Sequence, residues 1–436
     1  MTPSDTGVVG VSDSARAALA DIVSTYAARR QGWDPSVPVQ VFDAEVLWPG
    51  RPGIVDVVAA FGDRLVHVPF GLRASGEDAR FIPDGDDAVL GTFVDAEGAA
   101  IVFDAARDAV VAAMLLERVS GEVVEASLIR PLREDRGSVT LAMDDRIAFT
   151  IYNEVVDGPR PDLELFLALD EVGFNHLAAP LAVWRRAGRD LGVAQEYLAG
   201  ASSGLALALT SVRDLYASGG PPELAGGDFG AEAHRLGTMT ARMHIGLDQA
   251  FGRRVGDFGR WAQGIEASLR SLAPHTLERP DVEELLRQVR ALQVSSQAIR
   301  THGDFHLGRT CRTEQGWYVV DFASGRRPAS MAGAVTEPDE DGPVYRSPLA
   351  DVADLLWSME SMATSAADER DQSGRDGLAE LAHAWVARNR RAFLAGYLGV
   401  PGISGLVPPG REALRVLTES FELVRAAVHQ ARLDEA

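Results

Sequence analysis

Hydrophobic positions in the first part of the chain fall mostly in short runs separated by turn residues. The runs lie at residues 39–42, 54–61, 64–68, 88–93 and 100–103. Runs of this length between turns predict strands of a small sheet. An amphipathic helix is expected before them at residues 12–30, capped by Ser12 or Asp13, because its apolar positions recur at helical spacing. A second helix is expected at residues 105–116.

A second group of strands is predicted further along the chain. Residues 139–143 and 146–152 flank Asp144-Asp145, a sequence that favours a hairpin turn. A helix at residues 161–170 and two strands at 177–187 and 192–198 are expected next.

The pattern changes after Gly200 to long segments with helical periodicity. These segments lie at residues 205–217, 230–250, 257–273, 282–292, 349–362, 378–397 and 411–432. Strand-like signals return only around His302 and at residues 317–321. Residues 326–347, rich in Gly, Pro and charge, predict a loop. The sequence therefore predicts a strand-rich first part, a boundary near residues 200–204 and a helix-rich second part.

Composition narrows the possible classes of protein. The 436 residues suggest two or three domains or lobes, and 46% hydrophobic residues can build a large core. A net charge of −21 argues against a nucleic-acid partner and against anionic membranes. No apolar run is long enough to span a membrane, and no signal peptide is expected. The single cysteine, Cys311, rules out an intrachain disulfide and favours a reducing, cytoplasmic location.

All 42 basic residues are arginine, so the chain contains no lysine. A bias in coding composition towards arginine is a sufficient explanation. The chemical consequence holds whatever the cause. No step in this protein can use a lysine ammonium, either as a Schiff base or as a phosphate-binding group.

The candidate chemistry lies in one stretch of the second part. Residues 301–309 read Thr-His-Gly-Asp-Phe-His-Leu-Gly-Arg, and a short apolar strand ending in Asp321 follows about a dozen residues later. Two carboxylates at the ends of short strands suit phosphoryl transfer, in which one orients an attacking hydroxyl and the other holds Mg²⁺ on the nucleotide phosphates. The alternative is that Asp304 is an ordinary turn residue and Asp321 a strand-end cap.

This stretch resembles the catalytic and metal-binding segments of the aminoglycoside-phosphotransferase-like kinases. It is more closely similar to the actinobacterial maltokinases and their glucosamine kinase relatives. Similar segments occur in the same order at residues 195–200, 207–216, 236–244, 347–356 and 385–397. The resemblance runs from about Glu45 to Val428.

The resemblance implies a role for each matching position. Asp304 corresponds to the catalytic base, with His302 orienting the catalytic turn, and Asp321 corresponds to the Mg²⁺ ligand. The implied nucleotide-binding residues are Glu196 and Leu198 at an adenine-binding hinge, Ser138 in the hairpin loop, and Arg309. The implied substrate-binding residues are His306, Asp351 and Trp385, although an aromatic residue at helical spacing is more often part of a core. Glu164 resembles the helix glutamate that pairs with a strand lysine.

Three positions depart from the family pattern. Thr150 stands where related kinases have the phosphate-contacting strand lysine. Arg309 stands where they have an Asn or Gln that helps to bind Mg²⁺, and a guanidinium repels a cation but can bind phosphate. Ala323-Ser324 follow Asp321-Phe322 where maltokinases have Glu-Gly, which favours a different sugar.

The expected fold is therefore α+β and bilobal, of the protein-kinase-like type, with ATP in the cleft between the lobes. Residues 1–126 are expected to form an N-terminal cap subdomain, 127–200 an intermediate subdomain of a small N-lobe, and 201–436 a larger helical C-lobe. The expected activity is ATP- and Mg²⁺-dependent phosphorylation of a sugar, glucosamine or maltose. The alternatives are a catalytically impaired relative that acts as a binding or regulatory module, and an aminoglycoside-type phosphotransferase.

Overall fold

The computed structural model describes residues 13–76, 88–95, 98–124, 126, 128–135, 137–322, 343–371 and 377–434. The chain divides into two compact units. The first unit comprises Met1–Arg160 and Ala178–Ala199, and the second comprises Pro161–Leu177 and Gly200–Ala436. The three-part division expected from the sequence stays a prediction.

The first unit contains two antiparallel sheets. One has the order β1-β2-β3-β5-β4, with β9 also pairing with β3. Its strands are β1 (Val39–Trp48), β2 (Gly53–Phe61), β3 (Arg64–Ala74), β4 (Val89–Asp95), β5 (Gly98–Asp104) and β9 (Glu154–Val155). The other has the order β10-β11-β8-β7-β6. Its strands are β6 (Ile129–Glu134), β7 (Ser138–Met143), β8 (Ile147–Tyr152), β10 (Pro180–Arg186) and β11 (Arg189–Glu196).

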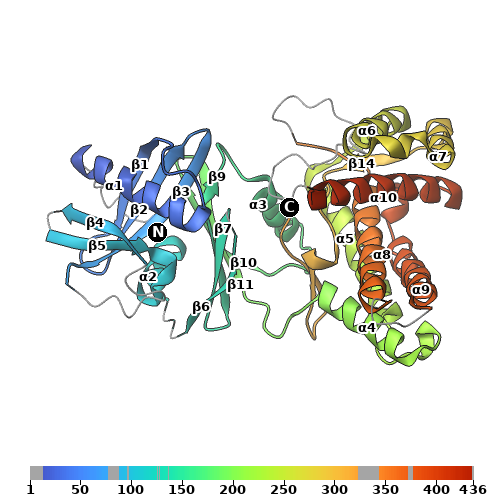
Figure 1. The fold of residues 1–436 in the computed structure, drawn as a ribbon, viewed down its shortest axis with the longest axis horizontal. Helices are drawn as coiled ribbons and strands as arrows, with labels where there is room; N and C mark the ends of the chain where they lie inside the picture. The colour runs from blue at the N-terminus through green and yellow to red at the C-terminus, as the bar shows by residue number, and fades with distance from the viewer. Residues whose placement is uncertain are drawn as a thin grey trace. The chain divides into compact units, whose positions relative to one another are not determined.

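Two helices complete the cores of the first unit (Figure 1). The helix α1 (Asp13–Tyr26), which runs on into a π-helical turn at Ala27–Gln31, buries Leu19, Ile22 and Val23 against the first sheet. The helix α2 (Ala109–Ser120) packs in a cluster that takes residues from both sheets. Asp108 caps α2 by accepting the N–H groups of Val110 and Val111, so the helix begins later than the sequence pattern indicated.

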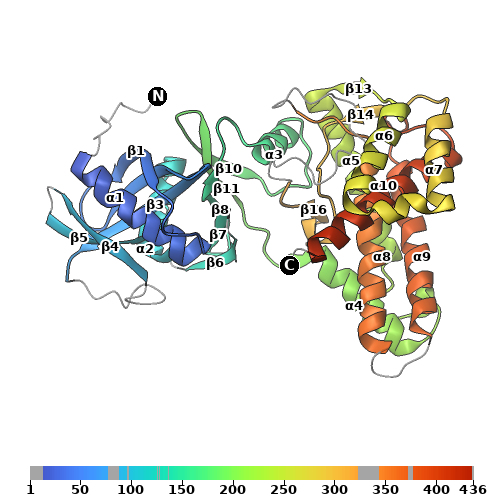
Figure 2. The same cartoon turned by 45° about the horizontal axis from the view of Figure 1, so that its top comes forward.

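The second unit is mainly helical. Its helices are α3 (Pro161–Glu171), α4 (Gly204–Ser218), α5 (Gly230–Phe251), α6 (Phe258–Leu272), α7 (Pro280–Ala291), α8 (Leu349–Asp371), α9 (Leu378–Leu398) and α10 (Arg411–Asp434). Two small sheets accompany them. One is ordered β12 (Ser202–Ser203), β15 (Thr310–Arg312), β16 (Trp317–Val319), and the other pairs β13 (Arg253–Val255) with β14 (Gln297–Ile299). Figure 2 shows α8 beside α9 in this unit.

Most predicted elements are confirmed, with differences at their ends. The helix α8 runs nine residues beyond its predicted end at Met362, through a polar stretch that dilutes the apolar pattern. The strand β6 was not predicted, because Arg130 and Arg133 interrupt its few apolar positions. Ser12 lies outside the described residues, as does most of the loop predicted at 326–347.

Two glycines allow α5 and α9 to pack closely. A Cβ atom at Gly237 would lie 2.1 Å from the carbonyl oxygen of Phe393, and one at Gly396 would lie 2.0 Å from that of His234. Real atoms do not approach this closely, so any side chain here would push the helices apart. This contact holds in place the part of the second unit that carries His244 and Tyr397.

We predict that Gly237→Ala destabilises the protein by at least about 2 kcal/mol, because the added methyl meets backbone rather than a flexible side chain. Gly220→Ala is the matched control, since a Cβ there has nothing within 4 Å. Thermal melting followed by circular dichroism measures both. Equal melting temperatures for the two variants would contradict the proposed packing constraint.

Candidate active site

The His-Gly-Asp turn follows β14 and is held by one buried carboxylate. Asp351, near the start of α8, accepts the N–H of His302 at 2.8 Å and the N–H of Gly303 at 3.0 Å. Its side chain is fully buried. Gly303 has φ = 85°, a conformation that glycine adopts without strain. The two hydrogen bonds therefore fix the backbone immediately before Asp304.

A polar chain behind Asp351 completes its hydrogen bonding. The Nε2 atom of His244 in α5 lies 3.2 Å from Asp351, and its Nδ1 lies 2.9 Å from the Tyr397 hydroxyl in α9. Burial is the largest single influence and raises the pKa of Asp351, but His244, His302 and Arg346 together outweigh it, and the net pKa is lowered. Asp351 is thus an ionised carboxylate surrounded by donors, which is the arrangement that a buried charge requires.

The side chain of His302 is buried, and its ring stacks on Phe322 at 4.9 Å between centroids. Burial lowers the pKa of His302 to about 4, so the ring is neutral at neutral pH. The N–H of Asp304 points to its Nδ1 at 3.4 Å. These contacts fit an orienting role for His302.

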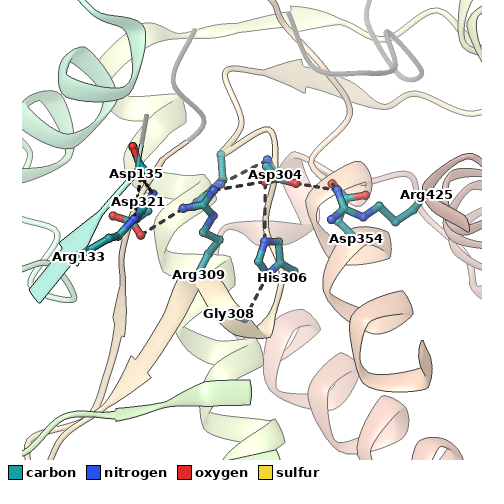
Figure 3. A network of polar contacts seen from close by, with 10 residues as sticks. Arg133, Asp135, Asp304, His306, Gly308, Arg309, Asp321, Asp354 and Arg425 are labelled. Atoms are coloured by element: carbon teal, nitrogen blue, oxygen red, sulfur yellow. Dashed lines mark hydrogen bonds and ion pairs between the residues drawn. The ribbon is translucent and has the colours of Figure 1, made fainter. Parts of the chain in front are cut away.

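Asp304 itself is partly exposed and surrounded by cationic or donor groups (Figure 3). Its Oδ1 accepts from Nη1 of Arg425 in α10 at 2.7 Å. Its Oδ2 lies 3.7 Å from Nε2 of His306 and 3.6 Å from Nη2 of Arg309. Burial on its own raises the pKa of Asp304, but His306 and Arg425 outweigh it, and the net pKa is far below its usual value. Asp304 is therefore ionised, and its Oδ2 has no partner at hydrogen-bonding distance among these neighbours.

The hairpin of β15 and β16 brings Arg309 beside Asp321. Thr310 pairs with Val319, and the carbonyl of Arg309 accepts the N–H of Val320 at 2.9 Å. At the open end of this ladder, Nη1 of Arg309 donates to Oδ2 of Asp321 at 3.1 Å. Arg309 thus stands between the two carboxylates that the sequence motif identified (Figure 3).

Asp321 is the more exposed carboxylate and has an unusual backbone conformation. Its side chain is 46% exposed, and its φ is 55°. A non-glycine residue in this region is strained, and such strain gathers at functional sites. Mg²⁺ commonly binds through one or two carboxylates and the substrate phosphates, so Asp321 fits a phosphate-bound Mg²⁺ as a single protein ligand. No cluster of three or more acidic, His or Cys ligands occurs in the described part of the chain.

The expected adenine hinge lies at the end of β11 in the first unit. The N–H of Tyr197 donates to the carbonyl of Arg146, and the N–H of Glu196 donates to that of Ala179. Within the described residues the N–H of Leu198 makes no hydrogen bond. An adenine ring nitrogen accepts hydrogen bonds, and a backbone N–H at this position is the donor that it would need.

The hairpin loop and strand positions differ from a phosphate-binding arrangement. Oδ1 of Asp135 accepts the N–H groups of Gly137 and Ser138, both at 2.9 Å, so these donors are already used. Thr150 in β8 hydrogen-bonds to Thr140 across the sheet at 2.9 Å. Thr150 therefore supplies no cation for phosphate binding, as the sequence indicated.

Glu164 and Trp385 have partners that the resemblance did not imply. Glu164 in α3 accepts from Nη1 of Arg300 at 2.6 Å, a contact within the second unit. Trp385 is 1% exposed and donates its indole N–H to Ser211. The structure therefore places Trp385 in the core of the second unit, away from Asp304, and Asp351 under the turn rather than at the surface. Among the candidates for substrate binding, His306 is the one that contacts Asp304.

Sequence reasoning did not assign roles to Arg425, Asp354, Ser358 and His244. Arg425 lies 121 positions from its partner Asp304, and no local pattern marks it. Its position in an amphipathic helix is equally typical of an exposed arginine. The contact between Ser358 and the N–H of Leu307, at 3.2 Å, also spans 51 positions of the sequence. The position of Ala323-Ser324 lies outside the described residues.

The fold has the same architecture as solved glucosamine kinase structures. One, a glucosamine kinase in complex with glucosamine, ADP and inorganic phosphate, matches with a TM-score of 0.64 and 19% identity over 97% of this chain and 96% of that one. Another glucosamine kinase crystal form matches with a TM-score of 0.65, 19% identity, and 97% and 95% coverage. The chain therefore has the α+β fold of these glucosamine kinase structures.

The sequence comparison points to the same group. Residues of this chain are 28% identical over 227 positions to a glucosamine kinase of Streptacidiphilus jiangxiensis, a match that covers 46% of this chain and 44% of that protein. The match thus spans less than half the length of the curated relative. No family model matches the chain. The resemblance to glucosamine kinases identified from sequence is confirmed, and none of the described helices could span a membrane.

We predict that Asp351→Asn destabilises the protein by about 2–4 kcal/mol at pH 7, because an amide leaves at least one buried donor without its acceptor. Since the folded-state pKa of Asp351 lies below its ordinary value of 3.8, its stabilising contribution is present above that pH and is lost as the pH falls. The difference in the free energy of unfolding between wild type and variant should therefore become smaller at acidic pH. Urea unfolding from pH 7 to pH 3 measures it.

Asp368→Asn is the control, since Asp368 lies exposed on the same helix. Equal free energies of unfolding for the two variants at pH 7 would show that Asp351 does not hold the turn.

Proposed function

We propose that this protein is a sugar kinase that transfers the γ-phosphoryl group of ATP to a hydroxyl of glucosamine. The observation that carries the proposal is Asp304. Its carboxylate is ionised and follows directly on the turn that Asp351 holds, and among the described residues its Oδ2 accepts no hydrogen bond. The full-length likeness in fold to glucosamine kinases supports the choice of reaction, and the glucosamine bound in one of those structures supports the choice of acceptor.

Asp304 acts in the proposed reaction as the group that orients the acceptor. The acceptor hydroxyl donates to Oδ2, its oxygen forms a bond to the γ-phosphorus, and the bond from that phosphorus to the β–γ bridging oxygen breaks. The hydroxyl proton passes to Asp304 and ADP leaves with the electron pair. A strongly acidic carboxylate suits this task, because phosphoryl transfer has a loose transition state in which positioning matters more than base strength.

The other groups bind the substrates. Glu196 and Leu198 present backbone groups to adenine, and His306 contributes to the sugar site beside Asp304. Asp321 would hold Mg²⁺, which supplies charge neutralisation to the phosphates when bound. Arg309 faces the same region with a buried Nε that no acceptor satisfies among the described residues. We assign Arg309 to phosphate binding, in place of a second metal ligand.

ATP consumption with purified protein and Mg²⁺ tests the proposal on a panel of glucosamine, maltose, glucose, N-acetylglucosamine and aminoglycosides. We expect turnover with glucosamine. Asp304→Asn should reduce that turnover by about a thousandfold or more, because the amide cannot accept the proton, while the melting temperature changes little. Retention of most of the turnover in Asp304→Asn would remove Asp304 from its role.

Asp321→Ala tests the metal assignment separately. We expect the affinity for ATP in the presence of Mg²⁺ to fall about tenfold or more, and the affinity measured with a chelator to change much less. Isothermal calorimetry measures both. Equal losses with and without Mg²⁺ would indicate that Asp321 contributes to nucleotide binding in another way.

A second candidate function is a catalytically impaired relative that binds a sugar or a partner. Two observations favour it. Thr150 is engaged with Thr140 in a chain without lysine, and Arg309 pairs with the carboxylate of Asp321, the proposed metal ligand. This reading expects no turnover on any member of the panel and sugar binding that is independent of Mg²⁺. We also propose that the protein is cytoplasmic and that its chain divides into three parts at residues 126 and 200.

A further inference from the structure

One face of α8 supports the whole segment from His302 to Leu307. Asp351, Asp354 and Ser358 lie at positions i, i+3 and i+7, which share a helix face. Asp351 accepts hydrogen bonds from the N–H groups at the start of the segment, and the Ser358 hydroxyl accepts one from the N–H of Leu307 at its end. Asp354 lies between these two contacts and has a different neighbour.

That neighbour is Arg425, which also contacts Asp304, the proposed base. Nη1 of Arg425 is 2.7 Å from Oδ1 of Asp304 and 3.9 Å from Oδ2 of Asp354. The side chains of Arg425 and Asp354 are 11% and 10% exposed. The guanidinium lies over the Trp357 ring at 5.7 Å, and its Nε has no acceptor among the described residues. Figure 3 shows Arg425 and Asp354 beside Asp304.

We propose that Asp354 is a positioning residue that competes with Asp304 for Arg425 and thereby sets how freely Asp304 accepts the sugar hydroxyl. The inference rests on the proposed kinase function. Asp354 touches neither substrate in this account, and it acts on Asp304 through the guanidinium alone.

The charges around Asp354 give this competition a pH dependence. Burial is the largest influence and raises the pKa of Asp354 to about 7, with Asp351 and Asp304 adding to the rise and Arg425 and Arg346 opposing it. These four groups come from its own helix, the catalytic turn, α10 and the segment before α8. The proton occupancy of Asp354 therefore changes in the neutral range.

The two protonation states have opposite effects on the base. When Asp354 is neutral, Arg425 remains with Asp304 and weakens the hydrogen bond by which that carboxylate orients the sugar hydroxyl. When Asp354 loses its proton to solvent, its negative charge draws Arg425 away, and Asp304 is freer to accept the hydroxyl. Turnover should therefore rise as the pH increases through about 7.

The experiment is the pH profile of kcat for wild type and Asp354→Asn, from pH 5.5 to 8.5. We expect kcat of the wild type to rise by about fivefold or more across this range relative to the variant, which stays in the low-turnover form. Taking the ratio of the two profiles removes the titration of the sugar amine, which both proteins share. Asp368→Asn, on the exposed side of the same helix, should keep the wild-type profile.

Two further variants separate positioning from a merely structural role. Arg425→Gln should also lose the rise near pH 7, and adding Asp354→Asn to Arg425→Gln should change the profile no further, because Asp354 acts through Arg425. A rise near pH 7 that persists in Asp354→Asn, at any absolute rate, overturns the inference. So does a further change in profile when the two substitutions are combined.

Failure of the kinase proposal gives a different result. Wild type that turns over no acceptor on the panel overturns the proposed function, and this inference with it. Turnover with a profile unaffected by Asp354→Asn overturns this inference alone. Melting temperatures supply a readout without substrate. Because the folded-state pKa of Asp354 is raised, its contribution to stability is lost as the pH rises through about 7, so wild type should lose stability relative to Asp354→Asn.

Discussion

The buried carboxylate of Asp351 is the constraint on which the candidate site depends. It accepts two consecutive backbone N–H groups of the His-Gly-Asp turn and lies against His244, all without contact with solvent. A buried charge is tolerated only when its hydrogen bonds are complete, so the turn cannot shift without a large cost. Through His244 and Tyr397 the same carboxylate is tied to α5 and α9. Asp304, the proposed base, is therefore supported by helices rather than by a free loop, and its geometry exists before substrate arrives.

Arginine takes the cationic roles in this site. A guanidinium presents several donors in one plane, so Arg309 can face Asp304 and Asp321 at once and Arg425 can face Asp304 and Asp354 at once. A lysine ammonium presents its three donors from a single nitrogen and lacks this planar geometry. In this chain each of the two guanidinium groups thus links a pair of carboxylates.

The helices and most strands could be predicted from sequence because their apolar positions follow the period of the element. The strand β6 could not, since Pro131 and its flanking arginines leave it little apolar surface, and it is held by pairing with β7. The candidate site likewise contains residues that a local pattern predicted and residues that it did not. Asp304, Arg309 and Asp321 lie in one short stretch and were found together. Arg425 and Ser358 reach that stretch from distant helices, and Trp385 has an aromatic side chain that serves the core as well as it would serve a sugar.

The path of the chain also has a consequence for how this protein can be divided. It passes from one compact unit to the other three times, near residues 160, 177 and 199. A fragment ending at 160 would lack β10 and β11, and one beginning at 200 would lack α3. Neither unit is therefore a contiguous piece of the gene. Recombination or truncation at a single point therefore cannot exchange or remove one unit and leave both intact.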